Sequence, residues 1–227
     1  MHLIVIIILI FAVIFGPQYW VQYVMQRYNR KPEKNFTGTG GELARHLLDR
    51  YELAEVKVEI TDQGDHYDPL DKAVRLTEDK FNGKTLTAIT VAAHEVGHAL
   101  QDKAGESMFR WRTKLASAAA GAQKMGSFLL FLAPVLTVVT RAPPAGLLSV
   151  LAALLILGSG LAVQLVTLPV ELDASFRKAL PVLKSGYLDQ RQYRPAERIL
   201  RAAALTYVAA SLAGLLNFWR WMQVIKR

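Results

Sequence analysis

Apolar positions in this chain are gathered into long blocks. Residues 3–25 contain no charged side chain, and further apolar blocks cover 126–140, 145–170 and, less strongly, 202–219. About 20 apolar residues in a helix are enough to cross a hydrocarbon core of about 30 Å. Only the short proline-containing turn "RAPPA" separates the second block from the third. The pattern therefore predicts a membrane helix at 1–25 and a transmembrane hairpin within 116–170.

Basic residues suggest how these predicted helices are oriented. Four of them follow the first block between positions 27 and 34, and Arg177, Lys178 and Lys184 follow the third block. Positively charged residues favour the cytoplasmic side, so the pattern places 26–115 and the region after Val170 in the cytoplasm. The last block is ambiguous, because spanning would put the basic C-terminal residues outside. Whether 202–227 adds a fourth membrane helix is therefore left open.

The polar region between the first two blocks shows shorter periodicities. "GELARHLLDRYEL" has the spacing of an amphipathic helix, with Thr39 or Gly40 as its cap. Val56, Val58 and Ile60 alternate with polar residues as in a strand, and after the turn-rich "TDQGDHYDPLDK" the segment "AVRLTE" predicts a second strand. The segment up to Asp102 is typical of a long helix capped by Thr85 or Thr87.

Composition narrows the choice of partners. The 227 residues are 52% hydrophobic and 20% charged, with a net charge of +8 and no cysteine. The basic residues gather at the predicted membrane borders and across 177–201, without a zinc-finger or glycine-aromatic signature. Contact with the lipid bilayer explains them better than binding to nucleic acid. Because cysteine is absent, any transition-metal site must use nitrogen and oxygen ligands.

The long predicted helix carries a motif that suggests metal chemistry, "HEVGH" at residues 94–98. Residues four apart share one face of a helix, so His94 and His98 can direct ring nitrogens at one zinc ion. Glu95 lies beside them and can take a proton from a bound water. Gly97 lowers helix propensity by about 1 kcal/mol but lets another backbone or the substrate approach closely. A helix that carries these residues by coincidence is the simpler alternative.

A catalytic zinc site needs three protein ligands and one open position. His94 and His98 supply two, and the sequence lacks the third histidine of the metzincin pattern. The candidates for the third ligand are His46, His66, Glu171 and Asp173. Chain topology favours Glu171, because the predicted hairpin returns the chain close to where it left. An interfacial salt bridge from this acidic pair to Arg177 or Lys178 is the alternative.

Four separated motifs resemble a known family. "HEVGHALQ", "DHYDP" followed by "AVRLTE", and "VELDASFRKAL" followed by "RAAALTYVAASL" are similar to the neutral zinc metallopeptidase family of bacterial membrane proteins, the YugP-like group. More distantly, the arrangement resembles membrane-bound gluzincin peptidases. The resemblance implies His94 and His98 as zinc ligands, Glu95 as general base and Glu171 as third ligand.

The resemblance also implies roles around the metal. In the gluzincin pattern an aspartate four residues after the ligand glutamate orients the first histidine, but this chain has Ser175 there and Asp173 two residues after Glu171. Either residue can accept a hydrogen bond from the ring N–H of a metal-bound histidine. The segment "DKAVRLTE" is implied to be the edge strand beside the site, where an extended peptide can bind.

These observations predict a mostly α integral membrane protein with three to four transmembrane helices and a small α+β zincin-like catalytic domain. The predicted divisions are an N-terminal membrane helix (1–25), a cytoplasmic catalytic region (26–115), the hairpin (116–170), a third-ligand helix with a basic cytoplasmic segment (171–201) and a C-terminal hydrophobic segment (202–227).

The predicted function is that of a zinc-dependent endopeptidase in the plasma membrane, multi-pass, with its active site facing the cytoplasm. Its partners would be peptide or protein substrates, membrane proteins among them. Glu95 would move the proton, and His66, Tyr67 or Arg177 would stabilise the oxyanion. The alternatives are a membrane scaffold with a structural metal and a small transporter. The missing cysteines disfavour the scaffold, and the scarcity of ionisable residues in the apolar blocks disfavours the transporter.

Overall fold

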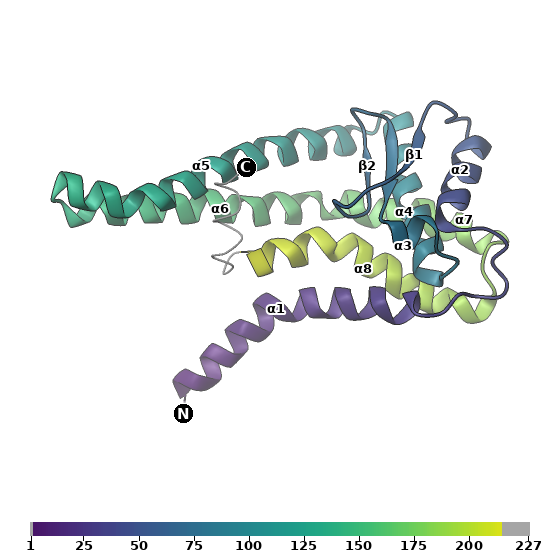
Figure 1. The fold of residues 1–227 in the computed structure, drawn as a ribbon, viewed down its shortest axis with the longest axis horizontal. Coiled ribbons are helices and arrows are strands. Elements are labelled where there is room, and N and C mark those ends of the chain that lie inside the picture. The colour runs from purple at the N-terminus through teal and green to yellow at the C-terminus, as the bar shows by residue number, and fades with distance from the viewer. Residues whose placement is uncertain (1, 215–227) are drawn as a thin grey trace. The chain divides into compact units, whose positions relative to one another are not determined.

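The computed structural model describes residues 2–214 and is mostly helical, with one small sheet (Figure 1). In chain order its elements are α1 (His2–Asn29), α2 (Gly40–Arg50), β1 (Lys57–Ile60), β2 (His66–Asp68), β3 (Ala73–Leu76), α3 (Glu78–Phe81), α4 (Leu86–Lys103), α5 (Ser107–Thr140), α6 (Pro143–Leu172), the π-helix η1 (Asp173–Ala179), α7 (Leu180–Lys184) and α8 (Gln190–Gly214). Two compact units are formed within this chain. One comprises 1–18, 111–167 and 207–227 as far as these are described, and the other comprises 19–110 and 168–206.

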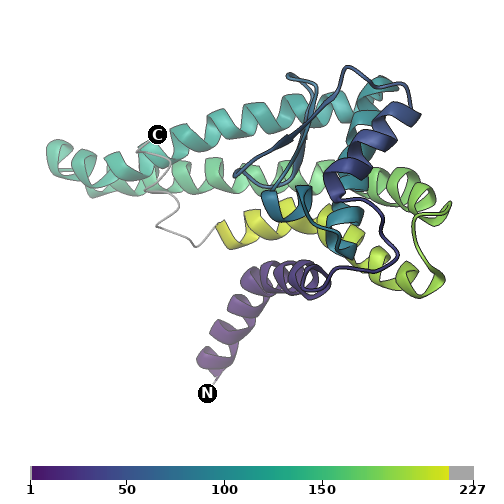
Figure 2. The same cartoon turned by 45° about the vertical axis from the view of Figure 1, so that its right-hand side comes forward.

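Helix α4 is the centre of the second unit. It contacts α2, α3, β2, β3, η1 and α7, and the two views agree that the sheet and the short helices surround it (Figure 2). Every residue from Leu86 to Ala99 is buried. A helix that is apolar on nearly all sides is stable only inside a core. The two histidines and the glutamate of the motif are therefore held in the interior of this unit.

Helices α2 and α4 begin at capping residues that the sequence predicted. Thr39 accepts a hydrogen bond from the backbone of Glu42, whose side chain accepts one from the backbone of Thr39, which is a complete capping box. Thr85 caps α4 by accepting from the backbone N–H of Ala88. In α2 the apolar face of Leu43, Ala44, Leu47 and Leu48 is buried. The two predicted helices and their Thr39 and Thr85 caps are thus confirmed.

The sheet contains one strand that the sequence pattern did not predict. Its order is β1-β3-β2, with β1 parallel to β3 and β2 antiparallel to it. Strand β2 lies within the stretch that was interpreted as turns, and it pairs Tyr67 with Val74. The prediction that "DKAVRLTE" forms an edge strand is wrong, because β3 has a partner on each side. Strands β1 and β2 occupy the two edges.

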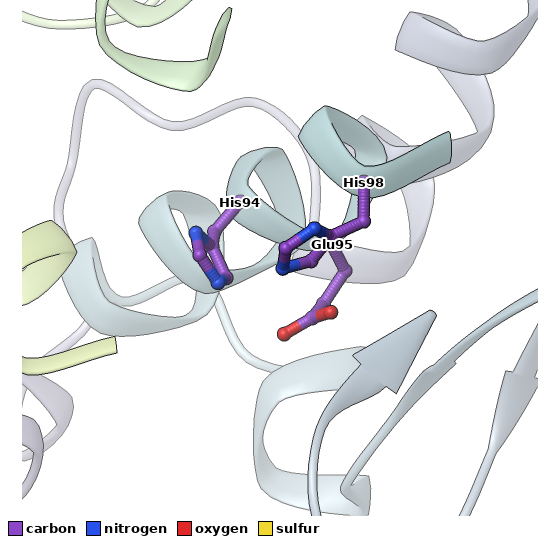
Figure 3. A group of neighbouring side chains, drawn as sticks. All are labelled: His94, Glu95 and His98. Carbon is purple, nitrogen blue, oxygen red and sulfur yellow. The ribbon is translucent and has the colours of Figure 1, made fainter. Parts of the chain in front are cut away.

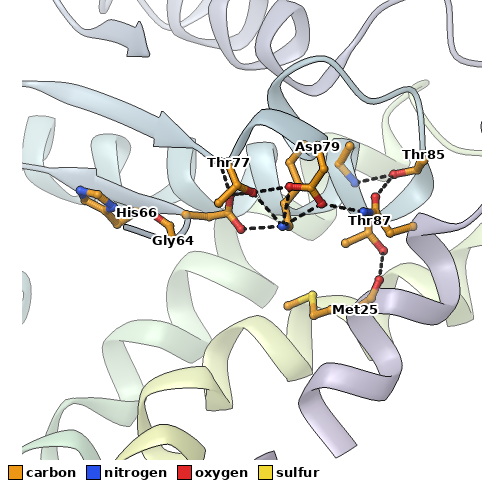
Figure 4. Close-up of polar contacts among 11 residues, drawn as sticks. Met25, Gly64, His66, Thr77, Asp79, Thr85 and Thr87 are labelled. Carbon is orange, nitrogen blue, oxygen red and sulfur yellow. Dashed lines mark hydrogen bonds and ion pairs between the residues drawn. The ribbon is translucent and has the colours of Figure 1, made fainter. Parts of the chain in front are cut away.

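A polar network joins the end of α1 to the start of α4 (Figure 4). The Asn29 side chain accepts a hydrogen bond from the Thr85 hydroxyl and donates one to Asp79. The hydroxyl of Thr87 donates to the backbone carbonyl of Met25 at 2.9 Å. The first turn of α4 is therefore bonded to the end of α1 at two points, which restrains the helix that carries the site.

The predicted integral membrane fold is not supported. Helices α5 and α6 run alongside each other as a hairpin in both views. Among the residues that the structure describes, however, no single helix is both long and apolar enough to cross a membrane. Two helical segments bent by 41° relative to each other meet those requirements only when taken together, namely Ser107–Gly126 and Phe131–Thr140. The block predicted at 126–140 is the second half of α5, whose first half carries Arg110, Arg112 and Lys114. The prediction of three to four transmembrane helices is therefore wrong. Residues 215–227 of the predicted C-terminal segment lie outside the described residues.

Candidate functional site

His94, Glu95 and His98 form a compact group on α4 (Figure 3). Their exposed fractions are 2%, 6% and 2%, so all three polar side chains are buried. The two imidazole rings lie with centroids 4.8 Å apart and nearly perpendicular planes. One nitrogen or oxygen atom from each of the three residues lies within 4.8 Å of the other two, a spacing that can hold a metal ion. The i, i+4 spacing predicted this arrangement.

Glu171 reaches the same point from the end of α6. Its Oε2 lies 3.1 Å from Nε2 of His98 and 3.5 Å from Nε2 of His94. The carboxylate is 2% exposed. Of the four candidates for a third ligand, Glu171 is the one that the structure brings to both histidine Nε2 atoms.

In each imidazole the nitrogen that does not face Glu171, Nδ1, has a hydrogen-bond partner. The Ser175 hydroxyl donates to the backbone carbonyl of Leu200 at 3.1 Å, so its oxygen is left to accept from Nδ1 of His94 at 3.0 Å. Gln101 lies 2.9 Å from Nδ1 of His98 through its Oε1. These partners assign the ring protons to Nδ1, which leaves an Nε2 lone pair on each neutral ring directed at Glu171.

The donor set fits a divalent metal. Two neutral imidazole nitrogens and one carboxylate oxygen converge in a buried space, and acceptors facing one another repel unless a cation lies between them. Nitrogen and oxygen ligands from two histidines and a glutamate are a known catalytic zinc combination. The outer hydrogen bonds from Ser175 and Gln101 are those that metal-bound histidines typically make.

Gly97 explains how the two halves of the site approach so closely. A Cβ atom at this position would lie 2.7 Å from the backbone carbonyl oxygen of Ala174 in η1. The backbones of α4 and η1 therefore pack directly against each other at this point, with no room for a side chain on residue 97. The π-helix begins at Asp173, directly after α6, and π-helical turns are frequent at functional sites. The sequence suggested a close approach at Gly97 but did not reveal what approaches.

Charged side chains of η1 form ion pairs close to the site. Lys178 contacts Glu106 at 2.6 Å and Asp173 at 3.2 Å. Burial alone would raise the pKa of Asp173, but hydrogen bonds from Gln101 and Lys178 outweigh it and hold that pKa below its ordinary value. Burial opposes the charge of Lys178 as well, yet the two carboxylates raise its pKa. Asp173 is therefore an ionised acceptor, and it reaches His98 through Gln101 rather than directly.

The remaining predicted site residues lie in other surroundings. Nδ1 of His66 bonds the carbonyl of Gly64 at 2.8 Å, and the hydroxyl of Tyr67 donates to Asp102 at 2.7 Å (Figure 4 shows the former pair). Burial and this bond raise the pKa of Tyr67 well above its ordinary value. The Arg177 side chain is 85% exposed and lies 3.9 Å from Asp173. His46 bonds Tyr187 at 2.8 Å, away from the histidine pair.

Gln101 is a functional candidate that the sequence analysis missed. It is completely buried and lies three residues after His98 on the same helix. Residues at this spacing are neighbours on a helix surface, which is the signal that could have identified it.

Comparisons with known proteins agree with this chemistry. A family model described as "Putative neutral zinc metallopeptidase" matches residues 3–226, nearly the whole chain. The chain therefore belongs to this family of zinc metallopeptidases. It is similar to the "Putative membrane protease YugP" of Bacillus subtilis (strain 168), with 34% identity over 217 residues that cover 92% of each chain. No solved structure matches it significantly. The family resemblance identified from the sequence motifs is thereby confirmed.

Proposed function

We propose that this protein is a zinc-dependent endopeptidase whose metal is held by His94, His98 and Glu171. The observation that carries the proposal is the meeting of two buried Nε2 atoms with the Glu171 carboxylate, 3.1 Å and 3.5 Å away. A zinc ion bound there would polarise a peptide carbonyl and acidify a water molecule. Membership of the zinc metallopeptidase family supports the same activity.

Glu95 is the residue proposed to move the proton. It follows His94 directly, is only 6% exposed, and lies within the same group of potential ligand atoms. Its carboxylate would take a proton from the attacking water and deliver it to the departing amine of the peptide. General acid–base catalysis of this kind contributes about 10²–10⁴-fold to a rate. Ser175 and Gln101 would hold the imidazoles in orientation during the reaction.

Replacement of Glu95 by glutamine tests this assignment. Glutamine keeps the size of the side chain but cannot accept the proton, so Glu95→Gln should bind about one zinc per chain and lose at least about 100-fold in peptide hydrolysis. The matched control is Glu78→Gln on the exposed face of α3, which should retain wild-type hydrolysis. Full hydrolysis by Glu95→Gln would refute the base assignment. A wild-type protein that hydrolyses peptides but binds no divalent metal would refute the metal site.

We propose further that the protein works at the cell membrane, with the site on the cytoplasmic side and membrane proteins among its substrates. The name of its Bacillus subtilis relative, which describes a membrane protease, supports the association with the membrane. The α5–α6 hairpin also presents large apolar side chains, among them Val138, Val139 and Leu155, which are 74–77% exposed. Extended apolar surfaces of this kind mark membrane or protein contacts. Flotation of the full chain with vesicles should recover it in the lipid fraction, whereas recovery in the aqueous fraction would contradict the placement.

A further inference from the structure

Gln101 bonds both a histidine of α4 and the segment carrying Glu171. Its Oε1 meets Nδ1 of His98 at 2.9 Å. Its Nε2 donates to the backbone carbonyl of Val170 and to Asp173, both at 2.9 Å. Val170 immediately precedes Glu171, and Asp173 follows it by two residues. The amide group of Gln101 thus bonds to residues on either side of the proposed ligand Glu171 in the chain. It also bonds to Nδ1 of the proposed ligand His98.

The surroundings of Gln101 fix the orientation of its amide. The Val170 carbonyl and the Asp173 carboxylate can only accept hydrogen bonds, and both face the same end of the side chain. That end must be the NH₂ group, since a flipped amide would place its oxygen against two other acceptors. Lys178 lies 3.2 Å from Asp173 and keeps that carboxylate oriented. The carbonyl oxygen of Gln101 therefore faces His98.

This orientation determines which nitrogen of His98 is available. Because the oxygen of Gln101 can only accept, Nδ1 of His98 must carry a proton and donate it. The lone pair of the neutral ring is then on Nε2, the atom that faces Glu171. Ser175 has the corresponding effect on His94, but its own donated bond goes to Leu200 of α8 and not to the neighbours of Glu171.

We propose that Gln101 is a positioning residue of the metal site, which holds His98 with Nε2 available and fixes its ring relative to the backbone around Glu171. This role rests on the proposed function, since it concerns residues that would hold the zinc ion. Gln101 does not contact the metal in this proposal. It acts through His98 and through the backbone on both sides of Glu171, so its loss should weaken metal binding without removing a ligand.

The test compares three variants of the full chain. Gln101→Met keeps the length of the side chain but offers no acceptor to His98. Gln101→Glu keeps an oxygen that can accept from Nδ1 but loses the two bonds donated to Val170 and Asp173. Gln192→Met is the matched control, because Gln192 is also a buried glutamine in hydrogen bonds, with Asn35 and the backbone of Asp189. Zinc affinity is measured by competition with a chelator. The protonation of the His98 ring nitrogens is measured by ¹⁵N NMR on metal-free protein, with His98→Gln used for assignment.

Loss of a residue that orients a metal-bound histidine typically lowers metal affinity by about 10–100-fold, and this is expected for Gln101→Met. Gln101→Glu should lose affinity as well, because its second oxygen would face the Val170 carbonyl and the Asp173 carboxylate in place of the NH₂ group. Gln192→Met should stay within about threefold of the wild type, a small part of that range. Metal-free wild type and Gln101→Glu should both carry a proton on Nδ1 of His98, and Gln101→Met should lose that preference. Equal zinc affinity in Gln101→Met and Gln192→Met would overturn the proposal.

The ring-nitrogen measurement decides the question even if Gln101→Met does not fold. A bare Nδ1 on His98 in the metal-free wild type overturns the positioning role, whereas a protonated Nδ1 in the wild type and in Gln101→Glu supports it. Failure of the broader function would look different, because a wild-type protein that binds no zinc contradicts the metal site whatever the state of the His98 ring.

Discussion

Replacing Gly97 by alanine tests the close packing on which the site depends. In an exposed helix this change would stabilise the protein by about 1 kcal/mol, because alanine has the higher helix propensity. Here the new Cβ atom would lie 2.7 Å from the carbonyl oxygen of Ala174, whereas ordinary contact starts at 3.4 Å, a difference of 0.7 Å. The obstacle is backbone in η1, so α4 and η1 must separate.

Overpacking of this kind costs about 1–3 kcal/mol, which outweighs the gain in propensity of about 1 kcal/mol. We expect Gly97→Ala to lower the free energy of unfolding by up to about 2 kcal/mol. The movement would also shift Ser175 and Glu171, which lie on either side of Ala174 along the chain, relative to the histidines. A misplacement of about 1 Å can lower activity about 100-fold, so we expect at least about a tenfold loss of peptide hydrolysis.

The control is Gly121→Ala in the middle of α5, where a Cβ atom would meet nothing within 4 Å. This variant should gain up to about 1 kcal/mol. Chemical denaturation of both variants, with zinc content and hydrolysis measured alongside, isolates the cost of the clash as the difference between them. If Gly97→Ala were as stable as Gly121→Ala and kept wild-type zinc affinity, the close approach of α4 and η1 would be refuted.

Three further results are expected. Thr39→Ala removes the capping box of α2 and should lower the free energy of unfolding by about 1 kcal/mol in chemical denaturation, with zinc affinity unchanged; an unchanged stability would contradict the cap. Tyr67→Phe loses the bond to Asp102 and should lower stability by about 1 kcal/mol while hydrolysis stays near wild type, so a large loss of activity would assign Tyr67 to catalysis instead. Burial opposes the charges of Asp68 and Asp79, but the hydrogen bonds that they accept lower both pKa values. Their contribution to stability should therefore be complete above the ordinary carboxyl pKa of about 3.9 and be lost as the pH falls below it, and unfolding curves measured from pH 6 down to about pH 2 that showed no such loss would contradict this.

Local signals in the sequence predicted the parts of the fold that depend on neighbouring residues. Thr39 and Thr85 cap their helices because a hydroxyl can reach backbone N–H groups within one turn, whatever the rest of the chain does. The approach of His94 to His98 depends only on helix geometry. These features were correctly predicted for that reason.

Features that depend on distant partners were harder to predict. Strand β2 lies among aspartates and a glycine that favour turns, and it is a strand because β3 lies beside it. The role of Gln101 depends on Val170 and Asp173, about 70 residues further along the chain. The membrane prediction relied on block length and did not anticipate that the apolar part of α5 continues a helix with a charged first half.

The bond between Ser175 and the Leu200 carbonyl has a consequence for the order in which the site can be completed during folding. Ser175 presents its oxygen to His94 in this way only once α8 lies beside η1. The surroundings of His94 are therefore complete only after segments more than 100 residues apart, around His94 and around Leu200, have come together.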